Sequence, residues 1–154
     1  MFVGFVLVLI CWGQSNLQFG NLERTDGKHS GLSLLQVITL MIYLYFVRLD
    51  VELDGAVIAL QMESVFLALS GFFALWSWHY AIKNKLISQN ITKDEQGKVY
   101  LKLMPEPIVP VLSFPFAAFG ADVWTLSWLL LIPVGYILKR IRARIATNKD
   151  GGEK

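Results

Sequence analysis

The sequence predicts an all-α, polytopic integral membrane protein: a single membrane domain, 1–154, built as a bundle of four to five short or broken helical segments. Hydrophobic residues make up 55% of the 154 residues, and the mean hydropathy of +0.50 lies above that of soluble domains. The basic residues cluster at the ends of apolar segments rather than along one stripe. This pattern indicates orientation in a membrane and argues against a nucleic-acid partner.

The segment 55–80 is the predicted centre of the bundle, because it is long, apolar and carries one carboxylate in its interior, Glu63. A helix of about 25 residues rises about 1.5 Å per residue, enough to cross a hydrocarbon core of roughly 30 Å. Its end is dense in aromatic side chains, which are typical of a membrane–water interface. The predicted interfacial anchors here are Trp76, Trp78, His79 and Tyr80.

Small and polar residues share one face of this helix. Glu63, Ser70, Ala74 and Ser77 recur at helical spacing, and such a stripe lets a second membrane helix approach closely. We therefore expect Glu63 to face protein rather than lipid. Its expected role is a proton or cation relay, a partner for a cation on another subunit, or a protonated or hydrogen-bonded carboxyl that joins helices. Lys102 is the best-placed cation within the chain to reach it.

The chain before this helix divides into three parts. Residues 2–13 predict a short or interfacial helix, 14–31 a polar loop that contains a lone histidine, and 31–47 a second span. The acids of 48–54 are either a solvated connection or a means of concentrating cations.

The chain after this helix contains a polar stretch and then a proline-rich apolar stretch. Residues 81–98 predict a polar loop, and 99–119 a broken or re-entrant hairpin arm, because four prolines interrupt the helical ladder and Pro105-Glu106-Pro107 favours extended or broken backbone. Residues 122–138 predict a last span, with Trp124 and Tyr136 as its interfacial anchors, and 139–154 a basic tail. The basic regions 81–98 and 139–149 should both be cytoplasmic, so 99–119 and 122–138 should form a hairpin that turns at 120–122. The alternative is one long span over 108–138.

Part of the chain resembles the small prokaryotic relatives of the lysosomal potassium channel. Trp76-Ser-Trp-His79 has the Trp-x-x-His form that ends one helix in that family, and 112–120, LSFPFAAFG, is similar to its apolar Pro-Phe-Pro segment. The resemblance implies a helical membrane protein that conducts cations. The family's Arg-x-x-x-Phe-Ser-Asp motif is missing, so the sequence does not assign the chain to it.

No phosphate-binding loop, GxSxG, HExxH or kinase motif occurs, so we expect no enzyme, no cofactor and no metal site. The expected function is a non-catalytic subunit of a larger membrane protein complex. The alternative is a small homo-oligomeric cation channel or transporter that uses Glu63 and the segment 105–115. The expected partners are membrane lipids and other membrane subunits or further copies, in a plasma or inner membrane with a cytoplasmic C-terminus. The candidate intramembrane polar site comprises Glu63, Ser70, Ser77, Lys102 and Glu106.

Overall fold

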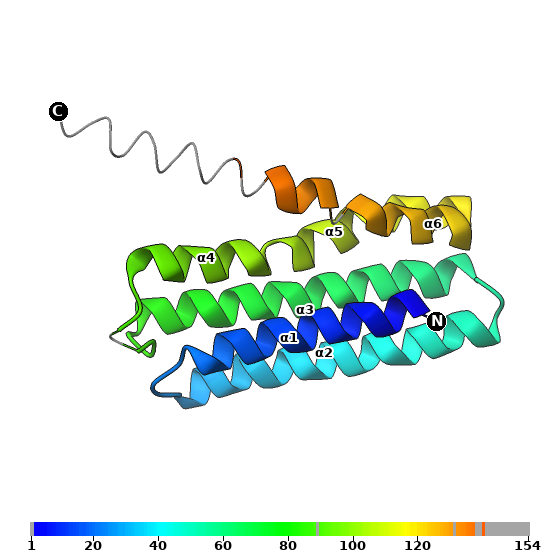
Figure 1. Ribbon diagram of the computed structural model, residues 1–154. Helices are drawn as coiled ribbons and strands as arrows, with labels where there is room; N and C mark the ends of the chain where they lie inside the picture. The colour runs from blue at the N-terminus through cyan, green and yellow to red at the C-terminus, as the bar shows by residue number, and fades with distance from the viewer. Residues whose placement is uncertain (1, 89, 131, 138–139, 141–154) are drawn as a thin grey trace.

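The computed structural model describes residues 2–88, 90–130, 132–137 and 140, and this part of the chain is helical without strands. Its elements are α1 (Phe2–Gly20), α2 (Gly27–Glu52), α3 (Val57–Lys83), α4 (Lys93–Leu103), α5 (Pro105–Ser113), the 3₁₀ helix η1 (Phe114–Phe119), α6 (Ala121–Ser127) and the 3₁₀ turn η2 (Trp128–Leu130). Figure 1 shows an up-and-down bundle in which successive long helices run antiparallel.

The helix α3 is the centre of the bundle, as the sequence predicts. It packs against α1, α2, α4, α5, η1 and α6. Two helices, α2 and α3, are long and apolar enough to cross a membrane by length and composition. In the apolar stretch of α3, 44% of the residues are buried, whereas in that of α2 only 17% are. The helix α2 therefore lies at the periphery of the bundle.

The N-terminal helix is longer than the sequence predicts, and the predicted loop 14–31 is wrong. α1 continues to Gly20, because its polar side chains are accommodated within the helix. Ser15 Oγ donates to the carbonyl of Cys11 at 3.0 Å, and Asn21 Nδ2 to that of Leu17 at 2.7 Å. These bonds to the preceding turn let polar residues remain in helical backbone.

The turn into α2 depends on Asp26. As the N-cap, its carboxylate accepts from the backbone N–H of His29 at 2.8 Å, and it also accepts from the Tyr80 hydroxyl at 2.7 Å. These two bonds favour the charged form and lower the pKa of Asp26 below its usual value. The same bonds join the start of α2 to the end of α3.

The acidic stretch 48–54 is mostly helical rather than a connection, since α2 ends at Glu52. Arg48 Nε and Glu52 Oε1 are 2.7 Å apart, one helical turn from each other on the exposed surface. The reversal into α3 follows at Asp54 and Gly55, with φ of 49° and 80°.

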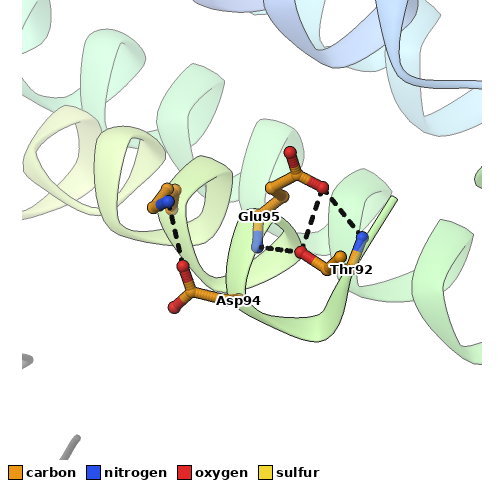
Figure 2. Close-up of polar contacts among 4 residues, drawn as sticks. Thr92, Asp94 and Glu95 are labelled. Carbon is orange, nitrogen blue, oxygen red and sulfur yellow. Dashed lines mark hydrogen bonds and ion pairs between the residues drawn. The ribbon is translucent and has the colours of Figure 1, made fainter. Parts of the chain in front are cut away.

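A helix also begins inside the predicted loop 81–98. Figure 2 shows its capping box: the Glu95 backbone N–H donates to Thr92 Oγ1 at 3.3 Å, and the Thr92 N–H donates to Glu95 Oε2 at 2.9 Å. The N–H and hydroxyl of Thr92 lower the pKa of Glu95. Asp94 and Lys98 add an ion pair at 2.9 Å. A sequence that appears as polar turn residues is therefore the start of α4.

The proline segment is broken, but less than the sequence predicts. The ladder stops at Met104, whose backbone keeps helical dihedrals of −57° and −39°. Pro105 and Pro107 then occupy the first turn of α5, where a residue without an N–H costs no intrahelical bond. The expectation of extended backbone at Pro105-Glu106-Pro107 is wrong for that reason.

The close approach of α3 and α5 depends on Gly71. A Cβ built on Gly71 would lie 2.6 Å from the nitrogen of Pro107 and 2.7 Å from the carbonyl carbon of Glu106. Only a residue without a side chain allows the backbones to come this close. Gly71 therefore sets the position of the first turn of α5.

The chain reverses at Gly120, whose φ is 104°, and α6 packs back against η1 and α5. Figure 1 shows this reversal at the same end of the bundle as the α2–α3 connection. The alternative of one long helix over 108–138 is therefore wrong. The predicted tail 139–154 lies outside the described residues apart from residue 140.

Candidate functional site

The polar stripe of α3 is buried, as the sequence predicts. Glu63, Ser70 and Ser77 are exposed by 2%, 1% and 0%, and Ala74 between them is fully buried. The expectation that Glu63 faces protein is confirmed. Because buried polar groups need hydrogen-bond partners, this stripe is the candidate polar site inside the bundle.

Serine hydroxyls of this stripe bond to α2 and, through it, to α1. Ser70 Oγ donates to the Gln36 carbonyl at 3.4 Å, and Ser77 Oγ lies 3.4 Å from Ser33 Oγ. Gln36 Nε2 then donates to Ser15 Oγ at 3.0 Å. This chain of weak bonds joins three helices, which is the role that polar residues have between membrane helices.

Glu63 differs from the serines, because its buried Oε1 has no hydrogen-bond partner among the described residues. Its electrostatic neighbours are the Tyr43 hydroxyl and Asp50 of α2. Tyr43 is fully buried and its hydroxyl likewise has no partner in the described chain. No hydrogen bond or ion pair joins these three groups within the described residues, and they contain no nucleophile with an adjacent base.

Glu106 is a second buried acid, on α5, and it is exposed by 8%. It lies beside the thiol of Cys11 on α1. Both side chains line a cavity of about 30 Å³ that Trp128 also borders. The structure therefore places Glu106 in the interior as a separate polar position, with Cys11 as a neighbour that the sequence did not single out.

Lys102 does not reach Glu63. It is exposed on α4, and no ion pair joins it to Glu63 in the part of the chain that the structure describes. The predicted partnership is wrong, because α4 packs against the opposite end of α3, where Trp78 contacts Gln96 of α4.

The predicted interfacial anchors fall into two groups. Trp78 and Trp124 are buried, at 0% and 4% exposure, and use their indole N–H groups inside the protein. Trp78 donates to the Gln96 carbonyl at 3.3 Å, and Trp124 donates to Ser64 Oγ at 2.9 Å. They therefore do not present their rings to lipid. The remaining anchors are exposed or half-buried: Trp76, His79, Tyr80 and Tyr136.

Within the described residues, no group of three or more His, Cys, Asp and Glu side chains is arranged to hold a metal ion. His29 lies at the start of α2 rather than in a loop, and it is fully buried. Its ring meets Phe19 edge-on, with centroids 6.2 Å apart. Both of its ring nitrogens are buried without a hydrogen-bond partner among the described residues.

No protein-family model, curated protein or solved structure matches the chain.

Proposed function

We propose that the protein is a polytopic integral membrane subunit, without catalytic activity, that packs within a larger membrane protein complex. The observation that carries this proposal is the proline-rich segment α5–η1. Pro110, inside α5, removes the N–H that would bond the carbonyl four residues earlier. At membrane depth such a carbonyl needs cover from protein or water.

The outer side of the same segment is apolar and uncovered in the single chain. Val111 is exposed by 61%, and Phe114 by 39%. Beside them runs an apolar groove between α3 and α5, about 450 Å³ in volume, which includes Phe72 and Pro107. A broken backbone next to exposed apolar side chains favours protein cover over lipid on this side.

The peripheral helix α2 supports insertion in a bilayer. Its outer face presents large apolar side chains, including Leu34 and Met41, exposed by 60% and 66%. A soluble protein of this size seldom leaves a surface of that kind uncovered. Resistance of the protein to extraction from membranes by alkaline carbonate is the expected result, and release into the soluble fraction would contradict insertion.

The proposed topology places the connection between α3 and α4 and the C-terminus in the cytoplasm. Single cysteines at Ser88 and Thr147, in a chain with Cys11→Ser, should be labelled from the same side of sealed vesicles. Labelling from opposite sides would contradict the hairpin crossing.

The chains that co-purify with the protein distinguish the two candidate functions. After extraction in mild detergent, native mass spectrometry should find this chain together with different chains in fixed stoichiometry. A symmetric assembly of this chain alone would instead favour the second candidate, a homo-oligomeric cation channel or transporter.

The second candidate is favoured by the buried Glu63 and Tyr43, whose polar atoms have no partner in the described chain. Glu63→Gln keeps the shape and the hydrogen-bonding capacity of a neutral carboxyl. If Glu63 only joins helices, stability should change by no more than about 1 kcal/mol. If Glu63 carries protons or cations, the variant should assemble normally but lose cation flux in reconstituted vesicles. Glu52→Gln is the matched control, since Glu52 is exposed at the end of α2.

A further inference from the structure

We propose that the small cavity between α1, α5 and η2 binds one water molecule, held between the Glu106 carboxyl and the Trp128 indole. Cys11 and Pro110 also line this cavity, and its volume is about 30 Å³. A cavity needs roughly 10–15 Å³ of space for a water-sized sphere to hold one water, and two to four polar partners to retain it. The volume meets the first condition, and we assign the polar partners to the unpartnered atoms of Glu106 and Trp128.

Two of the polar partners are side-chain atoms that are otherwise unsatisfied. Glu106 and Trp128 are exposed by 8% and 6%. Glu106 Oε1 and Trp128 Nε1 are buried, and neither has a hydrogen-bond partner among the described residues. One atom is an acceptor and the other a donor, so a water that accepts from the indole and donates to the carboxyl satisfies both.

The backbone of α5 offers a candidate third partner. Pro110 lies inside α5 and has no N–H with which to bond the carbonyl of Glu106, four residues earlier. Pro110 also lines the cavity. Waters commonly occupy such gaps in a helical ladder, and the proposed water would donate its second hydrogen to this carbonyl.

The Cys11 thiol is the neighbour of this carboxyl on α1 and lines the same cavity. Purely apolar cavities stay dry, whereas this one has an acid, an indole and a thiol among apolar side chains such as Leu7 and Leu67. The proposed water therefore links Glu106 of α5 to Trp128 of η2. No direct hydrogen bond joins these two side chains among the described residues.

A double-mutant cycle on thermal unfolding tests the link. Glu106→Leu and Trp128→Phe should each lower the melting temperature, and the double variant should lose clearly less than the sum, because either change alone already removes the bridge. Additive losses would overturn the proposal. The control pairs Glu106→Leu with Trp124→Phe. The Trp124 indole donates to Ser64 and does not line the cavity, so the two losses in melting temperature should add.

A high-resolution structure of the wild-type protein keeps the test independent of whether the variants fold. A single density peak within about 3 Å of both Glu106 Oε1 and Trp128 Nε1 is the expected result. Contact between the two side chains without a peak, or an empty cavity, would contradict the proposal.

Discussion

Replacement of Gly71 by alanine should loosen the bundle at the contact between α3 and α5. The added Cβ would lie 2.6 Å from the Pro107 nitrogen, whereas ordinary contact begins near 3.4 Å, so α5 must retreat by about 0.8 Å. The obstructing atoms are the Pro107 nitrogen and the carbonyl carbon and Cβ of Glu106, and none of them moves with a side-chain rotamer. Relief therefore requires movement of the whole first turn of α5.

The size of the effect follows from two opposing terms. Overpacking a well-packed contact costs about 1–3 kcal/mol. Alanine in place of glycine within a helix contributes about 0.5–1 kcal/mol in the stabilising direction. The expected net loss is therefore roughly 0–2.5 kcal/mol, about 1 kcal/mol at the centre of both ranges. At about 2–4 °C per kcal/mol for a chain of this length, the melting temperature should fall by up to about 10 °C.

Cys11 provides the assay, because it is the single cysteine in the sequence and is exposed by 5%. A thiol-reactive fluorophore in detergent solution should report its exposure on heating, when α5 separates from α1. Gly31→Ala in α2 is the matched control. Nothing lies within 4 Å of its Cβ position, so this change should leave stability equal or slightly higher. If Gly71→Ala raised the melting temperature as Gly31→Ala does, the close approach of α3 and α5 would be refuted.

Three further predictions concern polar contacts. Thr92→Ala removes the cap of α4 and should cost about 1 kcal/mol, with faster amide exchange over 93–96 and no change in α2. Trp124→Phe removes the donor to Ser64 and should cost about 0.5–1.5 kcal/mol, whereas Trp124→Phe in a Ser64→Ala background should cost measurably less. The pKa of Asp26 is lowered by the His29 N–H and then by the Tyr80 hydroxyl, so its contribution is complete above the unfolded value, about 3.9, and is lost as pH falls below it. The protection of the amides at 27–30, corrected for the intrinsic exchange rate, should therefore fall below about pH 4, and Tyr80→Phe should reduce that dependence.

The central helix was predictable because its length, apolar content and small-residue stripe agree. Residues 55–80 predict a span, and α3 occupies Val57–Lys83. The burial of Glu63 and Ser70 also follows from spacing alone, since both lie on the stripe. These features depend on local periodicity, which a single sequence displays.

The start of α4 could have been found but was missed. Thr92 and Glu95 have the spacing of a capping box, and Lys98 lies one turn beyond Asp94. The polar composition of 81–98 outweighed that signal in the prediction of a loop. A cap is more informative than composition here, because it specifies where the unpaired N–H groups of a helix find acceptors.

The roles of Trp78 and Trp124 could not be predicted from the chain. Tryptophan at the end of an apolar segment is typical of an interface, but it is equally suited to a core in which its N–H finds an acceptor. The choice depends on Gln96 and Ser64, which are distant in sequence or on another element. Only the tertiary contact distinguishes the two.

The geometry of α5 shows why prolines alone do not settle backbone structure. The atom nearest to a Cβ on Gly71 is the nitrogen of Pro107, and this nitrogen carries no hydrogen that another helix could block. Close backbone contact at that point therefore costs α5 no hydrogen bond. Further along, Pro110 has no N–H to donate to the carbonyl of Glu106, four residues earlier. Prolines in the first turn of α5 are thus compatible with a helix, and a glycine on the facing helix provides the space for their close approach.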